Sequence, residues 1–358
     1  MGTGLESGND DGAITLTKSE LQKRIDIVKS ATNDNQIFDI WGKFSSGQSA
    51  EKIQNDVLSN DGIVTAISYR PFDIRWTFYS GKSCGWIFRP RNKNIIGQVI
   101  NSETSPIGNN IGLVFAKQTT SRFEWDGIFI SDKVIVKHYV DYPAKSTGYF
   151  APLYLRPEGL ETKWQPNFNA EKFEHLTKFL TEKPTPIEVL DYIYGILFDP
   201  VYRIRFSEYL RRDFPRVPVI NAPKESDDDF VVTEEMFHFY VIAGERLRKL
   251  HLMQTKTPAP IEIAPPTATD LEIGAIKYKD GVLQLNPSKQ ITGIPEEVWN
   301  YRIGGYQVLD KWFKSHKRMT MTIDDFDHIA NVVGLLAETI KIQDDLRELT
   351  AKLNKQQH

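Results

Sequence analysis

The spacing of apolar residues predicts two helices within the first sixty residues. Segment 17–20 (TKSE) has the pattern of a capping box, in which a Thr hydroxyl and a Glu carboxylate accept hydrogen bonds from unpaired backbone amides. Leu21, Ile25 and Val28 follow at helical spacing and predict a helix of about fifteen residues. A second helix is expected from Ser49 to Leu58. Residues 1–12 are small and polar, and we expect them to form a disordered leader outside the fold.

Short runs of β-branched and aromatic residues, separated by turn pairs, follow between residues 63 and 155. This pattern predicts a sheet-rich lobe. The runs are IVTAIS, WTFY, NIGLVFAK, GIFIS, KVIVKHY and APLYL, and the turn pairs are Ser80-Gly81, Asn109-Asn110 and Asp126-Gly127.

Between residues 170 and 250 the periodicity becomes helical. The segments PIEVLDYIYGILF, YRIRFSEYLRRDF and TEEMFHFYVIAGERLRKLHL each carry an apolar residue every three or four positions, which predicts a helical lobe. Residues 221–229 (NAPKESDDD) interrupt this lobe, and the Pro-rich residues 255–269 end it as a semi-extended connector.

After the connector, the pair Asp280-Gly281 lies between two alternating runs and predicts a β-hairpin. One helical turn follows, and the pair Gly304-Gly305 separates it from another helix. From Ile323, apolar residues step by three and four over about thirty residues, with a phase shift after Ile340, a pattern that fits half of a coiled-coil seam. The alternative is that this last helix packs on its own domain.

Together these patterns predict an α+β protein, with a mixed, sheet-rich lobe, a helical lobe and a long C-terminal helix. The expected parts are an N-terminal leader with helices (1–60), the sheet-rich lobe (61–168), the helical lobe (169–254), the connector (255–270), a hairpin and helix that complete the sheet-rich lobe (271–322), and the C-terminal helix (323–358).

The composition excludes several classes of protein. The 44 Lys and Arg against 47 Asp and Glu give a net charge of −3, which excludes a polycationic binder and an acidic disordered chain, so any basic surface must be local. A single cysteine, Cys84, excludes a disulfide framework and a thiolate-rich metal site. The sequence has no signal-peptide pattern and no apolar run of about 18 residues, so we expect a cytoplasmic protein without a membrane segment.

The sequence patterns of the common nucleic-acid enzymes do not occur in a convincing context. Segment 199–202 (DPVY) departs from the methyltransferase tetrad because Val replaces the second Pro, and we interpret it as a boundary between helices. No P-loop pattern is present. Asp141 and Glu161-Thr162-Lys163 have a nuclease-like spacing, but the latter lies in a turn-rich stretch. The seven histidines show no metal-ligand spacing, so we expect neither a catalytic centre nor a metal site.

Positive charge is concentrated between Tyr69 and Ile100. This stretch carries six basic side chains against the single acid Asp73, with seven aromatic residues interleaved. Cations at this density neutralise nucleic-acid phosphates and release counterions. The predicted phosphate-binding residues are Arg70, Arg75, Lys82, Arg89, Arg91 and Lys93. The alternative is that Arg70 and Asp73 form a local ion pair and the aromatic residues belong to the core.

Two polar segments carry side chains suited to base edges, because Gln pairs with adenine and Lys or Arg with guanine. One follows a predicted strand (KQTTSR, 117–122) and the other is the hairpin KYKDGVLQLNPSKQ (277–290). The predicted base-reading residues are Lys117, Gln118, Ser121, Arg122, Lys277 and Lys279. The alternative is that these are ordinary polar turns. The five arginines between residues 203 and 216 are interspersed with acids, which is typical of a solvated, ion-paired face.

Seven segments, in order, resemble a known family. They are YRPFDIRWTFY, RPRNKNIIGQVI, NIGLVFAKQ, APLYL, LDYIYGILFDPVYRIRFSEYLRRDFPRVP, GERLRKLHL and IPEEVWNYRIGGYQVLDKWF. On these segments, and most specifically on FPRVP, IGGYQVL and KWF, residues 63–336 resemble the C-terminal specificity domain of Type ISP restriction–modification enzymes. They are also similar to the target-recognition domains of single-chain Type IIG enzymes.

In that family the domain follows an N6-adenine methyltransferase, and in ISP enzymes also a helicase-like ATPase and a nuclease, and it reads a short asymmetric duplex site. The resemblance implies binding to double-stranded DNA beside a methyltransferase domain or subunit, without a catalytic centre in this chain. It implies no cofactor here, since S-adenosylmethionine, and ATP with Mg²⁺ in ISP enzymes, are expected only in the parent enzyme or partner. A second hypothesis is a protein-interaction or scaffold module that uses the C-terminal helix.

Overall fold

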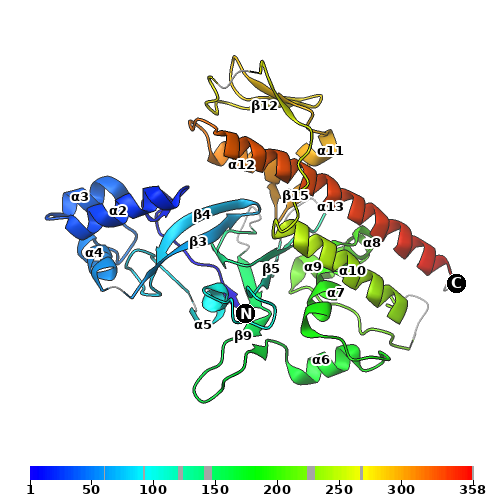
Figure 1. The fold of residues 1–358 in the computed structure, drawn as a ribbon. Helices are drawn as coiled ribbons and strands as arrows, with labels where there is room; N and C mark the ends of the chain where they lie inside the picture. Colours follow the sequence, from blue (N-terminus) through cyan, green and yellow to red (C-terminus); the bar gives the residue numbers. More distant parts are fainter. Residues whose placement is uncertain are drawn as a thin grey trace. The chain divides into compact units, whose positions relative to one another are not determined.

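The structure is a computed structural model that describes residues 1–59, 61–91, 93–119, 124–140, 147–223, 230–266 and 269–356. The chain forms two compact units. Figure 1 labels their helices and strands. Unit 1 contains residues 1–119 and 129–173, and unit 2 contains residues 120–128 and 174–358. The mixture of helices, several small sheets and a long C-terminal helix confirms the predicted α+β class.

Unit 1 combines short helices with small sheets. Its elements are β1 Gly2–Thr3, α1 Asp10–Ala13, β2 Ile14–Thr15, α2 Lys18–Ser30, α3 Asp34–Trp41, α4 Ala50–Leu58, β3 Ile63–Arg70, β4 Asp73–Tyr79, α5 Lys93–Ile96, the 3₁₀-helix Gly97–Val99, β5 Gly112–Ala116, β6 Ile128–Ser131, β7 Val134–Ile135, β8 Gly148–Pro152, β9 Tyr154–Leu155 and β10 Gln165–Pro166. Two four-stranded sheets have the orders β2-β4-β3-β7 and β1-β8-β5-β6, and β9 pairs with β10. The β3–β4 hairpin, in which Ile63 is opposite Tyr79 and Arg70 is opposite Asp73, is the longest pairing described.

The expectation of a disordered leader is wrong. β1 pairs with β8, with Gly2 opposite Phe150, and Leu5 is fully buried. The Leu5 amide donates to the Ile135 carbonyl oxygen at 3.0 Å, so the segment continues beside β7. Leu5 is the only large apolar residue between residues 2 and 13, and this is why the composition of the segment conceals a strand at the edge of a sheet.

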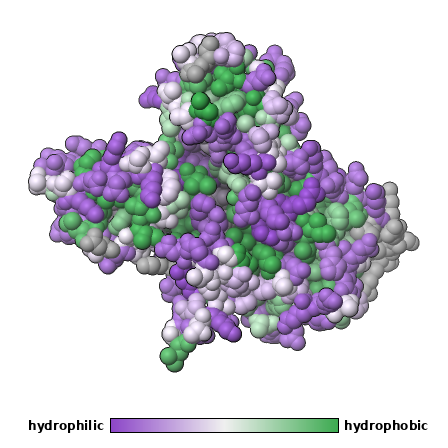
Figure 2. Space-filling model, in the orientation of Figure 1, coloured by the Kyte–Doolittle hydropathy of each residue, from purple (hydrophilic) through white to green (hydrophobic). Residues whose placement is uncertain are grey.

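The N-terminal helices follow the capping pattern only in part. The Thr17 hydroxyl accepts a hydrogen bond from the Glu20 amide at 3.2 Å, as predicted, but the Glu20 carboxylate forms an ion pair with Arg24 at 2.6 Å. Helix α4 begins after Ser49, as expected. Helix α3 has no counterpart in the sequence prediction. Hydrophilic residues cover much of the visible surface of these helices in Figure 2, in keeping with their buried apolar faces.

Unit 2 contains the helices of the predicted helical lobe and a four-stranded sheet. Its elements are α7 Pro186–Phe198, α8 Pro200–Arg205, α9 Ser207–Arg212, α10 Glu234–His251, β11 Glu262–Ala264, β12 Lys277–Lys279, β13 Val282–Gln284, β14 Gln290–Thr292, α11 Glu296–Trp299, β15 Arg302–Ile303, β16 Tyr306–Gln307, α12 Val308–Ser315 and α13 Ile323–Gln356, while α6 (Ala170–Thr177) crosses the boundary between the units. The sheet has the order β11-β14-β13-β12. The predicted hairpin is present, because Asp280 and Gly281 join β12 to β13 with φ of 49° and 81°.

Helix α13 packs against α8, α10 and α11 (Figure 1). Its apolar residues Ile329, Val333, Leu336, Ile342 and Leu346 are at most 1% exposed. The alternative in which the last helix packs on its own domain is therefore confirmed. Phe326, Ile340 and Leu349 of the same seam are half-buried. Hydrophobic burial on this scale contributes to the core of unit 2.

Candidate nucleic-acid interface

The β3–β4 hairpin holds two of the predicted phosphate-binding cations beside Tyr69. Arg75 donates two hydrogen bonds to the Asp73 carboxylate, from Nε to Oδ1 at 3.0 Å and from Nη2 to Oδ2 at 2.9 Å. The guanidinium carbons of Arg75 and Arg70 lie 3.8 Å and 4.3 Å from the centroid of the Tyr69 ring. The Arg75 side chain is only 12% exposed, so its ion pair stabilises the hairpin. The ion pair described for Asp73 is with Arg75, not the Arg70 pair considered from the sequence.

Tyr69 connects this hairpin to the N-terminal segment. Its hydroxyl donates to Asp10 Oδ2 at 2.7 Å. Burial, and next the negative charge of Asp10, raise the pKa of Tyr69 to about 12. The phenol therefore remains a neutral hydrogen-bond donor at physiological pH.

A second group of cations surrounds the Glu6 carboxylate, and we call Glu6, Arg89, Arg91 and Lys137 the Glu6 cluster. Arg91 forms an ion pair with Oε1, Arg89 Nη1 lies 3.7 Å from the same oxygen, and Lys137 Nζ lies 3.4 Å from Oε2. The three cationic side chains are 27% to 53% exposed, whereas Glu6 is 19% exposed. Three cations around one carboxylate leave this surface with an excess of positive charge.

Backbone hydrogen bonds bring the members of the Glu6 cluster together from distant parts of the sequence. Glu6 and Arg89 exchange two of them, at 2.9 and 3.0 Å, and the Lys137 amide donates to the Leu5 carbonyl at 2.8 Å. A polar pocket of about 270 Å³ lies beside the cluster, and Arg70 and His138 are among the residues that line it.

The other predicted phosphate-binding residues are less informative. Lys82 donates to Asp61 Oδ2 and to the Ser59 hydroxyl, both at 2.7 Å, and its side chain is 45% exposed. A surface pair of this kind exchanges partners at little cost. Lys93 begins α5, but its side chain lies outside the described residues.

The predicted base-reading residues occupy two units. Lys117 and Gln118 directly follow β5 in unit 1 and are exposed, while Ser121 and Arg122 lie outside the described residues. In unit 2, Lys277 and Lys279 are exposed at alternate positions of β12. The assignment of base contacts to these residues stays a prediction.

Tyr278, between the two lysines, accounts for their exposure. Its ring stacks on Trp299, with centroids 4.6 Å apart, and its hydroxyl donates to the Ile294 carbonyl at 2.9 Å. Because successive side chains of a strand point to opposite faces, Lys277 and Lys279 lie on the other face. Asn286 of the same hairpin region is buried and donates to the Asp270 and Glu272 carbonyls, so its role is structural.

The arginines after α7 do not all form the solvated face that the sequence predicts. Arg203 is 6% exposed, its Nε donates to the Leu197 carbonyl at 2.5 Å, and its guanidinium carbon lies 4.5 Å from the Phe198 ring centroid. Arg212 does fit the prediction, since it lies 3.5 Å from Glu208 and both are well exposed. Asp199 caps α8, as the interpretation of DPVY as a helix boundary predicted.

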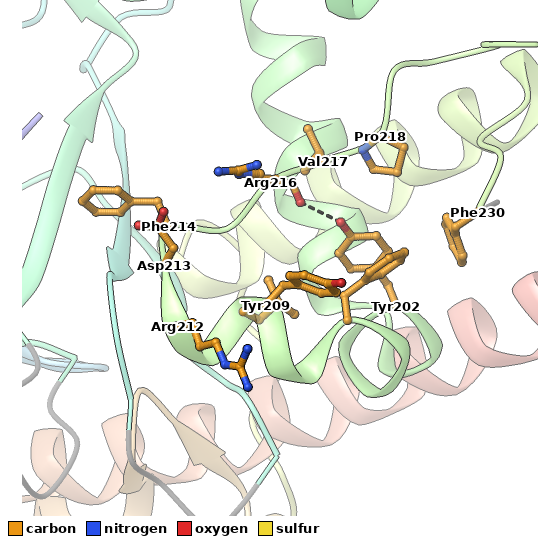
Figure 3. A pocket seen from close by; sticks show the side chains of 11 residues that line it. Tyr202, Tyr209, Arg212, Asp213, Phe214, Arg216, Val217, Pro218 and Phe230 are labelled. Atoms are coloured by element: carbon orange, nitrogen blue, oxygen red, sulfur yellow. Dashed lines mark hydrogen bonds between the residues drawn. The ribbon is translucent and has the colours of Figure 1, made fainter. Parts of the chain in front are cut away.

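A pocket of about 680 Å³ lies between α8, α9 and the segment that follows them (Figure 3). The rings of Tyr202, Tyr209 and Phe230 line it, and the Tyr202 hydroxyl donates to the Arg216 carbonyl at 2.6 Å. Tyr209 is 73% exposed. Arg212, Asp213 and Arg216 lie beside these rings in the lining. The pocket contains none of the residues predicted to contact phosphates or bases, so we do not assign it to the proposed nucleic-acid interface.

Sequence reasoning missed Glu6 and Lys137. Glu6 lies in the segment that composition assigns to a leader, and Lys137 follows a strand that is more than forty residues away from Arg89 and Arg91. The run VIVKHY predicts the strand before Lys137, but no sequence signal indicates which distant segment it meets.

Solved structures with the same fold include two Type ISP restriction–modification enzymes with DNA and a DrdV–DNA complex. The ATP-dependent Type ISP enzyme LlaBIII bound to DNA matches with a TM-score of 0.65 at 15% identity, over 96% of this chain and 23% of that one. A nuclease-deletion mutant of the Type ISP enzyme LlaGI in complex with a DNA substrate mimic gives 0.61 at 15% identity, over 96% and 27%. The DrdV–DNA complex gives 0.63 at 16% identity, over 98% and 35%. This chain thus spans about a quarter to a third of each of those proteins.

The family model for the Type ISP C-terminal specificity domain matches residues 1–345. The chain therefore belongs to this family. The match extends beyond the resemblance over residues 63–336, and it includes the N-terminal segment that carries Glu6. No curated protein sequence matches the chain.

Two features are absent from the part of the chain that the structure describes. Among these residues, no helix combines the length and the apolar character that crossing a bilayer requires. Within the same part of the chain, no three or more His, Cys, Asp or Glu residues are grouped so that they could hold a metal ion.

Proposed function

We propose that this chain recognises a specific sequence in double-stranded DNA and acts as the specificity module of a restriction–modification system. The observation that carries this proposal is the match of residues 1–345 to the Type ISP specificity-domain family. The exposed cations of unit 1 support it, because a chain of net charge −3 needs a local basic surface to attract a polyanion.

The roles of the two classes of side chain follow from their placement. Arg70, Lys82, Arg89, Arg91 and Lys93 would contact phosphates and set the register of the protein on the duplex. Lys117 and Gln118, with Ser121, Arg122, Lys277 and Lys279, would contact base edges. Arg75 belongs to the first set only if its pair with Asp73 opens, since both of its hydrogen bonds to that carboxylate are made in the structure.

The enzymatic steps would belong to other parts of the system. We propose that an N6-adenine methyltransferase domain, in the same protein or on a second subunit, is the partner of this chain, and that methylation and cleavage take place there. S-adenosylmethionine, and ATP with Mg²⁺, would bind to those parts. Cellular DNA as the target, together with the lone Cys84, favours the cytoplasm.

Selection from randomised DNA duplexes at low and at physiological salt tests the proposal, with sequencing of what the purified chain retains. We expect an asymmetric motif. Salt-sensitive retention without a motif would support DNA binding but place the specificity in a combined surface with the methyltransferase. No retention at either salt would contradict DNA recognition by this chain.

The rival function, a protein-interaction module that uses the C-terminal helix, has less support. Helix α13 packs against helices of unit 2, and five apolar residues of its seam are buried, as are Thr339 and Thr350. A helix whose apolar residues pack against its own unit supports the fold. No specific observation among the described residues favours its use as a docking surface.

A further inference from the structure

We propose that Glu6 competes with DNA phosphate for the cations of the Glu6 cluster and thereby limits how tightly the chain holds DNA of any sequence. This inference rests on the proposed function. It assigns Glu6 and Lys137, which the sequence analysis did not single out, to the phosphate-binding surface.

The arrangement of charges around Glu6 matches that of a phosphate site. Both carboxylate oxygens of Glu6 face cations, with Arg91 and Arg89 at Oε1 and Lys137 at Oε2. Cations from two segments of the chain converge on one anionic group, as they would on a phosphodiester. The carboxylate thus occupies the position in which these three side chains can bind one anion together.

The fold does not need the charge of Glu6 to hold this segment. Two backbone hydrogen bonds link Glu6 to Arg89, a third links Leu5 to Lys137, and the Leu5 side chain is fully buried. The backbone position is therefore fixed independently of the carboxylate. A neutral side chain of the same shape can take its place without loss of these bonds.

The three cations of the Glu6 cluster are partly exposed to solvent. Arg89 is 53% exposed and its closest nitrogen is 3.7 Å from Glu6, so it can turn toward a phosphate from solvent. Arg91 and Lys137 are 30% and 27% exposed and are partly neutralised by Glu6. A phosphate that approaches this surface must compete with the carboxylate for these cations. Each side-chain cation that pairs with a phosphate releases counterions from the DNA. Loss of the negative charge should therefore strengthen binding to all sequences alike.

The main experiment compares E6Q with E20Q in the complete chain. Both substitutions replace one Glu of unit 1 by its isosteric amide, and both remove an ion pair, because Glu20 pairs with Arg24 at 2.6 Å. We expect E6Q to lower the Kd for a random-sequence duplex by about threefold or more at low salt, and to steepen the slope of log K against log salt by up to about 0.9. E20Q should change the Kd by less than about 1.5-fold.

A double-mutant cycle with R91A links the effect to the cluster. In the wild-type chain Glu6 partly neutralises Arg91 and competes with phosphate for it, so R91A should raise the Kd by at most about twofold. In the E6Q background, where Arg91 would be free to bind phosphate, the same substitution should raise the Kd by about fivefold.

Each outcome decides the proposal. An E6Q chain that is folded by circular dichroism and binds random DNA no more tightly than E20Q overturns the competition, as does an E6Q chain that fails to fold, because the carboxylate is then structural. Equal effects of R91A in both backgrounds also overturn it. In all these cases DNA binding by the wild-type chain leaves the proposed function intact, whereas a wild-type chain that binds no duplex contradicts that function itself.

Discussion

The His251 imidazole of unit 2 is held in its neutral form by the polarity of its two neighbours. The Thr339 hydroxyl donates its proton to the Leu335 carbonyl at 2.8 Å, so it accepts from His251 Nε2 at 3.0 Å. His251 Nδ1 then accepts from the Tyr194 hydroxyl at 2.6 Å. Burial, and next the positive charge of Arg203, lower the pKa of His251 to about 3.

This lowered pKa makes the free energy of unfolding depend on pH. The unfolded chain binds a proton at His251 below pH about 6.5, while the folded chain does not until pH about 3, so stability is complete above pH 6.5 and is lost as the pH falls toward 3. We expect about 2 kcal/mol to be lost at this residue between pH 7.5 and pH 5. Urea unfolding at both pH values should show a smaller difference for H251Q. H175Q, at an exposed histidine, should retain the wild-type difference, and an equal pH dependence in all three chains would contradict the argument.

Two exposed residues separate the phosphate and base roles in the proposed interface. R89A removes a cation that would contact the backbone, so it should weaken binding to all duplexes alike and make the salt dependence shallower by about one unit. Q118A removes a side chain that would read an adenine, so it should relax preference at one base pair by about 1–3 kcal/mol. Competition binding with duplexes that carry single-base changes in the selected site measures the overall affinity and the preference at each base pair. Identical profiles for R89A and Q118A would contradict the division of roles.

At the scale of elements, helices α7 and α10 approach each other at two glycines. A Cβ atom on Gly195 of α7 would clash with the Tyr240 carbonyl oxygen, and one on Gly244 of α10 would clash with the Asp191 carbonyl oxygen. Across the same contact Arg248 donates to both oxygens of the Asp191 carboxylate, at 2.7 and 2.9 Å. The close approach and the bidentate ion pair together set the register between the helices.

G244A should therefore destabilise unit 2 although alanine favours the helix. Overpacking against a backbone carbonyl costs about 1–3 kcal/mol, which exceeds the gain of about 1 kcal/mol in helix propensity. Thermal unfolding should show a lower midpoint for G244A and little change for E235A on the exposed side of α10. A midpoint at or above that of the wild-type chain would mean that the helices separate easily and that their close contact contributes little.

The elements that the sequence predicts best are those with strong local signals. Periodicity and caps locate α2, α4, α7 and α10, and the pair Asp280-Gly281 locates the β12–β13 hairpin, because these signals act over a few residues. Helix α3 is missed since it spans only eight residues and its capping residue Asn33 lies in a polar stretch. β1 is missed because its two residues gain their conformation from pairing with β8, which is more than 140 residues away.

The same distinction applies to the candidate site at the scale of the whole molecule. The excess of cations between Tyr69 and Ile100 is visible in the sequence because it is a local property. The pairing of Arg75 with Asp73 and of Arg89 and Arg91 with Glu6 depends on how the chain folds, and it decides which cations are open to a phosphate. Local charge density predicts the surface, whereas the partners of each charge require the tertiary structure.

The chain also crosses between its two units in a way that the order of the predicted lobes does not indicate. The described part of segment 120–128, which connects β5 to β6 and includes the first residue of β6, belongs to unit 2. Trp125 is 1% exposed there, and the guanidinium carbon of Arg203 lies 5.7 Å from its ring centroid. The Asp126 carbonyl accepts from the Gly304 amide at 3.0 Å and its carboxylate from the Gly305 amide at 3.2 Å. Both glycines have positive φ, so the β15–β16 turn is shaped to meet this segment.

Trp125 should therefore stabilise unit 2, although the residues on either side of its segment belong to unit 1. W125A removes a large buried side chain and should cost about 3–5 kcal/mol. In hydrogen exchange followed by mass spectrometry, α8 and the turn at Gly304 should lose protection more than β5 and β6 do, because Arg203 and the turn contact this segment directly. W164A, at a half-buried tryptophan of unit 1, provides the control and should leave α8 protected. Loss of protection in β5 with α8 unchanged would place Trp125 in the core of unit 1 and contradict this division of the chain.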